Sequence, residues 1–272
     1  MLQEFSYVAP RTRSDLFTIL DEHQEQAKIL AGGTDLLVNI RNGVMLPKLV
    51  VDIKKVDGYQ GITYSSSEGL LFRPTVTINE ILRDPSVGKH YPLLVECGHD
   101  LASYQIRNRA TIMGNVVNAS PCSDMAPGLL CLGAQAIIAS SKGVRQVPFK
   151  EFFVGVKKTV LHPTEVLESI VIPASSAGGV GAYKKLKRIN GHDLGIVGVA
   201  VYIQKDLLRI AVSSAAPTPV VTPDLPASIS TEEAIAAVKA IISPISDVRC
   251  SKEYREFMVE VFVARLLKEV RK

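Results

Sequence analysis

The sequence predicts an α+β protein of two domains. Its 272 residues suggest about two domains of ordinary size, and 47% of them are hydrophobic, which is ample for buried cores. The run at 175–181 contains only small, uncharged residues and is typical of a linker, so we expect domains at 1–174 and 175–272. We further expect two lobes in the first domain, at about 1–55 and 56–174. The second domain should be an antiparallel sheet covered by helices.

The first lobe is organised around the segment 28–53. This segment predicts, in order, a buried strand, a glycine turn, a short helix and a second strand parallel to the first. Gly32 and Gly33 in the turn allow the backbone to approach a ligand closely, and the N–H groups at the helix start suit a phosphate. An ordinary turn capped by Thr34 or Asp35 explains the same pattern. The Asp35 carboxylate argues against an anion, unless it points away or binds a ribose hydroxyl.

A second informative stretch spans residues 105–127. No clear hydrophobic period runs through 115–127, where small and hydrogen-bonding residues dominate, and such a loop inside a domain is usually functional or disordered. Aliphatic residues at its start disfavour disorder. Thr111 and Asn115 carry side chains able to bind phosphate or ribose oxygens, and Gly114 permits close backbone approach. A structural turn rich in Asn and Asp is the alternative.

Alternation and helical spacing predict the remaining elements. In the second lobe they are strands at 62–64, 70–73, 136–140, 145–148 and 165–172, with helices beginning at Thr77 and Tyr91. In the second domain they are strands at 183–189, 196–203 and 208–212, a helix capped by Thr231 that reaches Ile242, and a helix at about 251–271. The apolar face of this last helix is expected to comprise Tyr254, Phe257, Met258, Val261, Phe262 and Leu266.

Composition excludes several classes of function. The net charge of +4 is spread along the chain, which argues against nucleic-acid binding, and no apolar run approaches the ~20 residues of a membrane span. No signal peptide is evident and the four cysteines form no C-x-x-C pair, so we expect a cytoplasmic chain with reduced thiols and no metal site. No hydrolase, P-loop or zinc-protease motif is present, and no glycine fingerprint follows a strand, so we expect no catalytic residue of those kinds and no Rossmann site.

Two motifs taken together resemble the flavin signatures of the molybdenum hydroxylases. They are Ala31-Gly32-Gly33-Thr34-Asp35-Leu36 and Gln105-Ile106-Arg107-Asn108-Arg109-Ala110-Thr111-Ile112-Met113-Gly114-Asn115. The chain is similar over essentially its whole length to the FAD-binding medium subunit of this family, which includes xanthine dehydrogenase and aerobic carbon monoxide dehydrogenase. The resemblance implies a two-lobed FAD-binding domain of the vanillyl-alcohol-oxidase/PCMH type, followed by a small α+β domain.

The resemblance also implies roles for particular residues. FAD would be bound non-covalently, with its diphosphate held by two segments, Ile29-Leu30-Ala31-Gly32-Gly33-Thr34-Asp35-Leu36 and Thr111-Ile112-Met113-Gly114-Asn115. Leu101 and Leu167 match apolar positions beside the flavin, and Asp124 matches a residue that hydrogen-bonds FAD. Lys185 matches a lysine near the flavin ring, where a cation favours reduced, anionic flavin.

The resemblance implies partners as well. A large subunit would carry the molybdenum cofactor and a small subunit two [2Fe-2S] clusters, from which electrons reach FAD and then NAD+, oxygen or another acceptor. Two alternatives remain: a scaffold of the same complex that has lost FAD, and a freestanding flavin oxidoreductase.

One residue departs from the family pattern, in which two glycines usually precede Asn115. Here Met113 takes the place of the first glycine. If that position needs positive φ, Met113 is strained by about 1–3 kcal/mol and Met113→Gly should tighten FAD binding.

Overall fold

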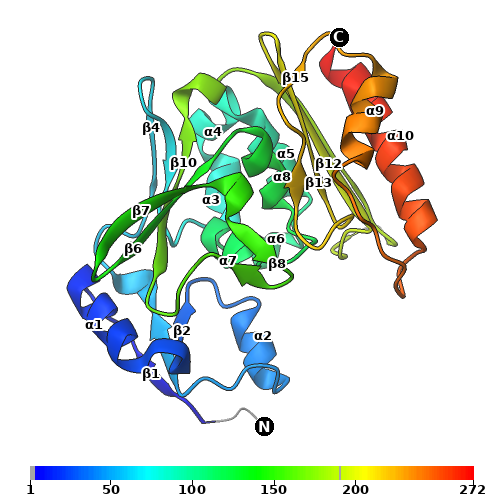
Figure 1. Ribbon diagram of the computed structural model, residues 1–272. Coiled ribbons are helices and arrows are strands. Elements are labelled where there is room, and N and C mark those ends of the chain that lie inside the picture. Colours follow the sequence, from blue (N-terminus) through cyan, green and yellow to red (C-terminus); the bar gives the residue numbers. More distant parts are fainter. Residues whose placement is uncertain (1–3, 190) are drawn as a thin grey trace.

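Three large sheets follow one another along the chain in the computed structural model, which describes residues 4–189 and 191–272 (Figure 1). The first is a parallel sheet of order β1-β3-β2, with strands β1 (Ser6–Val8), β2 (Ala27–Leu30) and β3 (Leu49–Asp52). Helices α1 (Arg13–His23) and α2 (Leu36–Arg41) connect these strands. Thr12 caps α1, and Leu16 and Leu20 on its inner face are buried. The parallel strands predicted around the glycine turn are confirmed.

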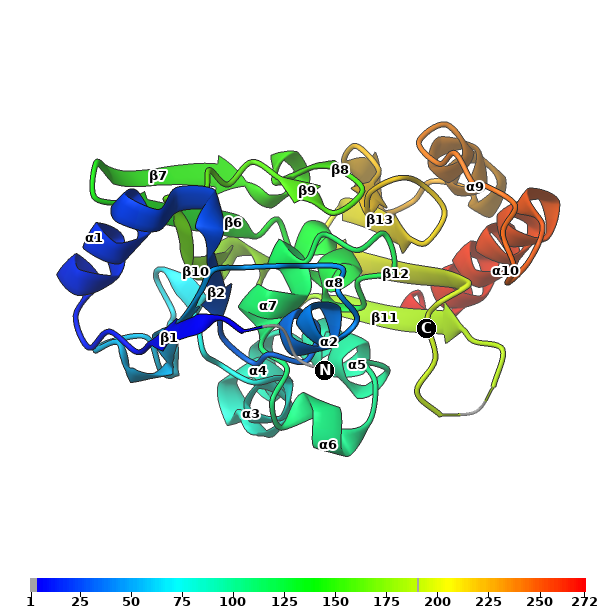
Figure 2. The same cartoon turned by 90° about the horizontal axis from the view of Figure 1, so that it is seen from below.

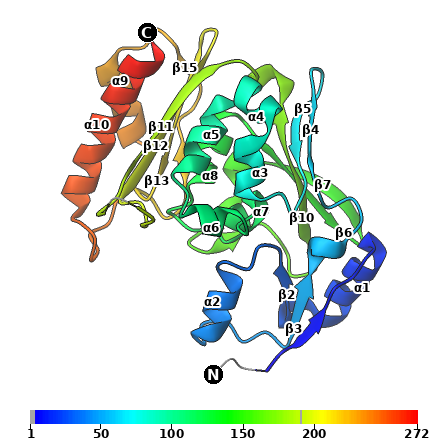
Figure 3. The same ribbon diagram turned by 180° about the vertical axis from the view of Figure 1, so that it is seen from behind.

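The second sheet is antiparallel and has the order β4-β5-β10-β6-β7. Its strands are β4 (Ile62–Ser65), β5 (Gly69–Phe72), β6 (Gln135–Ser140), β7 (Gly143–Pro148) and β10 (Val166–Pro173). Short helices lie between β5 and β6, namely α3 (Ile78–Arg83), α4 (Pro85–His90), α5 (Pro92–His99), α6 (Tyr104–Arg107), α7 (Ile112–Val117) and α8 (Met125–Cys131). A small hairpin, β8 (Phe153–Gly155) with β9 (Lys158–Thr159), precedes β10. Seen from two sides, α2 of the first unit lies next to α7 of the second (Figures 2 and 3).

The third sheet is antiparallel and is covered by helices on both faces. Its strands are β11 (Val180–Leu186), β12 (Val197–Gln204), β13 (Leu207–Ser213), β14 (Val220–Val221) and β15 (Leu225–Pro226). One face packs against α10 (Lys252–Val270), which also contacts α9 (Thr231–Lys239), while α5 and α8 of the second unit lie on the other face (Figure 1). Tyr183 and Tyr202 of the third sheet accordingly belong to the same apolar core as Leu93 and Leu129 of the second unit. The α+β fold class is confirmed.

The structure corrects local predictions in three helices. Residues 112–117 form helix α7 inside the stretch predicted to be a long loop, because Thr111 caps it and its buried aliphatic residues face the core. The N-cap of α9 is Ser230, one residue before the predicted Thr231, because a capping box joins Ser230 to Glu233. That helix ends at Lys239, before the predicted Ile242.

The third correction concerns the inner face of α10. Tyr254 and Phe257 were expected to be buried but are 46% and 58% exposed. The helix instead buries Arg255, whose guanidinium donates hydrogen bonds to the carbonyl oxygens of Ile196 and Ser214. This inward arginine sets the rotation of the helix about its axis.

None of the helices in the described part of the chain is both long and apolar enough to cross a membrane.

Candidate cofactor site

The glycine turn and the second motif touch backbone to backbone. A Cβ atom on Gly32 would lie 2.1 Å from the carbonyl oxygen of Arg109, far inside any real contact distance. Gly33 has φ +80, a left-handed conformation that L side chains rarely adopt. Each glycine is therefore required, Gly32 by the neighbouring loop and Gly33 by its own backbone.

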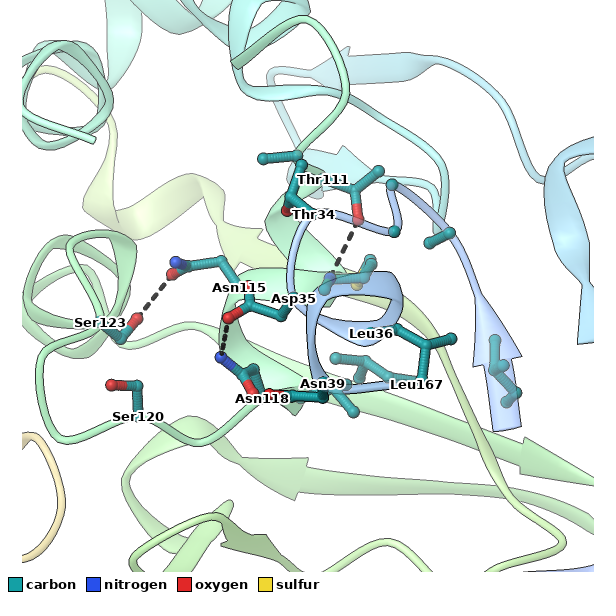
Figure 4. Close-up of a pocket in the computed structure, with 18 of the residues that line it drawn as sticks. Thr34, Asp35, Leu36, Asn39, Thr111, Asn115, Asn118, Ser120, Ser123 and Leu167 are labelled. Carbon is teal, nitrogen blue, oxygen red and sulfur yellow. Dashed lines mark hydrogen bonds between the residues drawn. The ribbon is translucent and has the colours of Figure 1, made fainter. Parts of the chain in front are cut away.

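The second motif is held in place by the cap of α7. The Thr111 hydroxyl accepts a hydrogen bond from the Gly114 N–H at 3.0 Å (Figure 4). Thr111 also pairs with Thr77 in an isolated bridge. The Ser123 hydroxyl donates to the side-chain oxygen Oδ1 of Asn115 at 2.6 Å, which orients the side-chain amide of Asn115. The motif is thus a rigid helix start rather than an open loop.

Backbone donors without acceptors gather on these two segments. Within residues 4–189 and 191–272, the N–H groups of residues 32–35 make no hydrogen bond to the protein, and neither do those of Thr111 and Met113. Unpaired N–H groups at helix starts bind anions, because their partial charges are positive and they lack partners of their own. The two segments together can bind a diphosphate through backbone groups alone.

These donors border a cavity of about 1160 Å³. The structure brings most of the predicted site residues to its wall: Ile29, Ala31, Gly32, Gly33, Thr34, Asp35, Leu36, Leu101, Thr111, Met113, Gly114, Asn115, Asp124, Leu167 and Lys185. The other two, Leu30 and Ile112, are buried in apolar clusters behind the wall. All three sheet units contribute residues, so the cavity depends on how the units pack.

A buried ion pair closes the side of the cavity formed by the third sheet. Lys185 Nζ lies 2.9 Å from the Asp124 carboxylate, and its side chain is 2% exposed. The Tyr183 hydroxyl donates to the same carboxylate at 3.2 Å. Burial raises the pKa of Asp124 to about 6, and the attraction of Lys185 opposes this shift only in part. Within the described residues, no group of three or more His, Cys, Asp or Glu is arranged to hold a metal ion.

The structure corrects the expectation about Met113. This residue lies in the first turn of α7 and is 3% exposed, and it is not among the non-glycine residues with positive φ. A helical methionine is unstrained and keeps its N–H for a ligand, so the argument that Met113→Gly should tighten FAD binding is wrong. The side chain belongs to the apolar core where that core borders the cavity.

Several polar residues on the cavity wall were not singled out from the sequence. They are Asn39, Asn118, Ser120, Ser123 and Lys157, the first four of which are labelled in Figure 4. Asn118 and Ser120 stand in the polar stretch 115–127, so its composition was the signal for them. Lys157 lies in the β8–β9 turn, far along the chain, and no local pattern marks it.

Comparison with known proteins identifies the family. Residues 3–175 match the family described as FAD binding domain in molybdopterin dehydrogenase, and residues 181–270 match the CO dehydrogenase flavoprotein C-terminal domain. The chain belongs to the FAD-binding medium subunits of xanthine dehydrogenase- and carbon monoxide dehydrogenase-type molybdenum hydroxylases, and it is an oxidoreductase subunit.

Individual relatives align over nearly the whole chain. The carbon monoxide dehydrogenase medium chain of Hydrogenophaga pseudoflava is 32% identical, covering 97% of this chain and 96% of its own. The xanthine dehydrogenase FAD-binding subunit of Escherichia coli O157:H7 is 31% identical, covering 97% and 95%. A chain of CO dehydrogenase from Oligotropha carboxidovorans superposes with a TM-score of 0.92 at 27% identity, covering 99% and 98%.

The site fits FAD, the cofactor of this family. The cavity has the volume to hold a dinucleotide, and unpaired N–H groups stand where two backbone segments meet. A Cβ on Gly32 would push these segments apart.

Proposed function

We propose that this chain carries electrons between iron–sulfur clusters and a diffusible acceptor. The electrons would enter from [2Fe-2S] clusters on a small partner subunit and leave to NAD+ or another acceptor, in a complex whose large subunit holds the molybdenum cofactor. Family membership supports this role, since two of the relatives are named a medium chain and a FAD-binding subunit. Bound FAD would supply the exchange between one-electron donors and a two-electron acceptor.

Residues of this chain would bind the diphosphate and the flavin ring of FAD. The free N–H groups of residues 32–35, Thr111 and Met113 would bind the diphosphate, and Leu101 and Leu167 would flank the flavin. Lys185 would offer its ammonium group to the flavin ring, with Asp124 and Tyr183 fixing its position. The expected domain boundary near 174–175 belongs to the same proposal: the first domain would supply both backbone segments and the second would supply Lys185.

The single observation that carries the proposal is the contact between Gly32 and the Arg109 carbonyl. This contact brings two sets of unpaired N–H groups to one cavity. In a Gly32→Val variant the Cβ would force the segments apart, so the variant should lose most of its flavin on gel filtration. The measurement is the FAD absorbance per chain of the purified protein.

Gly88→Ala is the matched control for this test. Gly88 lies within α4, and a Cβ there would meet nothing within 4 Å, so this variant should keep the wild-type flavin content. Full flavin content in Gly32→Val, with an unchanged apoprotein melting temperature, would show that Gly32 is not at the diphosphate.

The electron-transfer role needs a second measurement. When expressed with the products of neighbouring genes, the chain should co-elute with iron–sulfur and molybdenum subunits, and substrate should bleach its flavin absorbance. The Gly32→Val complex should reduce its clusters but show no flavin signal. Steady turnover of an organic substrate by this chain alone would contradict the proposal.

A further inference from the structure

Three polar side chains on the cavity wall, next to the proposed diphosphate site, are joined by hydrogen bonds. Asn118 Nδ2 donates to Asp35 Oδ1 at 3.0 Å, and Lys157 Nζ donates to Asn118 Oδ1 at 2.9 Å (Figure 4 shows the first bond). We call Asp35, Asn118 and Lys157 the polar bridge. It joins three separate elements, because Asp35 precedes α2, Asn118 ends α7 and Lys157 lies between β8 and β9.

The backbone fixes one end of the polar bridge. The Lys157 N–H donates to the Ala119 carbonyl at 2.9 Å, next to Asn118 in the chain. Both Lys157 and Ala119 have left-handed backbones, with φ of 59 and 44. Non-glycine residues persist in this conformation only where the surrounding structure holds them there. The β8–β9 turn is therefore anchored to the end of α7, and the Lys157 side chain starts from a defined position.

The other end of the polar bridge is the Asp35 carboxylate, which lies beside the N–H donors proposed to bind an anion. Asp35 stands among the unpaired N–H groups of residues 32–35, where a carboxylate would compete with an anionic ligand for the same donors. Its side chain makes no capping hydrogen bond to α2. It points instead toward Asn118 (Figure 4). The amide of Asn118 thus holds the carboxylate away from the donors of its own turn, and the Lys157 ammonium offsets its charge.

We propose that Asn118, held by Lys157, is a positioning residue for cofactor retention. It keeps the Asp35 carboxylate turned away from the diphosphate and ties the glycine turn to α7. This inference rests on the proposed place of the diphosphate between residues 32–35 and the start of α7.

A double-mutant cycle on Asp35 and Asn118 tests the inference through the FAD dissociation rate, followed by recovery of flavin fluorescence. Asn118→Ala should release FAD about five- to tenfold faster, because a charge-assisted hydrogen bond is lost and the carboxylate is freed. In the Asp35→Asn background the same substitution should change the rate less than about twofold, since no charge remains to be restrained. Equal effects in the two backgrounds would overturn the inference.

Two further variants keep the test decisive. Asn118→Asp preserves the size of the side chain but sets a second carboxylate against Asp35, so FAD should leave faster than from Asn118→Ala. Lys157→Ala should also speed release, whereas its exposed neighbour in the Lys158→Ala control, with the same change of charge, should not. Equal rates for the two lysine variants would contradict the role of Lys157.

The outcome also separates this inference from the proposed function. A wild-type chain that binds no FAD would overturn both. A flavin-loaded wild type whose Asn118 and Asp35 variants behave additively would overturn the polar bridge alone.

Discussion

Single residues determine how closely the two cofactor segments meet. Gly32 allows the Arg109 carbonyl to occupy the space of a side chain, and Gly33 allows the left-handed turn that follows. The sequence predicted that both glycines allow a close approach of the backbone. It did not predict that Gly32 makes room for the Arg109 carbonyl, since no pattern in 28–53 shows that residue 109 lies against it. Met113 was misjudged for a related reason: its helical backbone depends on the Thr111 cap and on core packing.

The Asp124 carboxyl makes the stability of the fold depend on pH. Its folded pKa of about 6 lies above the reference value of 3.8, because burial disfavours the carboxylate. The folded chain therefore binds this proton more tightly than the unfolded chain does. The resulting stabilisation is fully present below pH 3.8 and is lost as the pH rises through about 6.

This stabilisation can be measured against an Asp124→Asn variant, which cannot titrate at that position. The free energy of unfolding of the wild type, minus that of the variant, should fall by about 1 kcal/mol between pH 5 and pH 7. Urea unfolding of both apoproteins at the two pH values gives this difference. No measurable change over the same interval would mean that attraction to Lys185 outweighs burial and that the pKa of Asp124 is not raised.

At the scale of elements, α10 shows how a buried charge orients a helix. Arg255 is 1% exposed and donates to two carbonyl groups, with Asp247 3.2 Å from its other terminal nitrogen. The inner face continues through aliphatic residues, listed as Val259, Val263, Leu266, Leu267 and Val270. The length of α10 was predictable from its period and cap. Its rotation was not, because hydrophobic spacing counts an arginine as an outward residue.

Removing the Arg255 side chain should therefore lower the free energy of unfolding more than removing a large, exposed apolar side chain of the same helix. Arg255→Ala leaves two carbonyl groups without donors in a buried site and should lower the free energy of unfolding by about 3 kcal/mol or more. Phe257→Ala, on the exposed face, should change it by less than about 0.5 kcal/mol. Chemical denaturation of the two variants checks the comparison, and a larger loss from Phe257→Ala would refute this account of the helix.

At the scale of the whole molecule, the cavity forms where the three sheet units pack together. The first unit supplies the glycine turn, the second supplies the start of α7, and the third supplies Lys185. The third sheet reaches the cavity because α5 and α8 pack on one of its faces. The succession of the three units along the chain was predictable from periodicity, and most wall residues were predictable from the family resemblance. The order of strands within each sheet was not predicted. Contacts between distant segments were not, and Lys157 with its partner Asn118 is the clearest example.

The central claim is that backbone N–H groups of residues 32–35, Thr111 and Met113 bind FAD directly. Hydrogen–deuterium exchange of the purified chain, with and without FAD, reports on these groups. In the flavin-free protein they should exchange rapidly, because no acceptor in the described structure protects them. Saturating FAD should slow exchange in both segments together, and Gly32→Val should abolish the effect. Slowing elsewhere in the chain, with residues 32–35, Thr111 and Met113 still exchanging rapidly, would contradict the account.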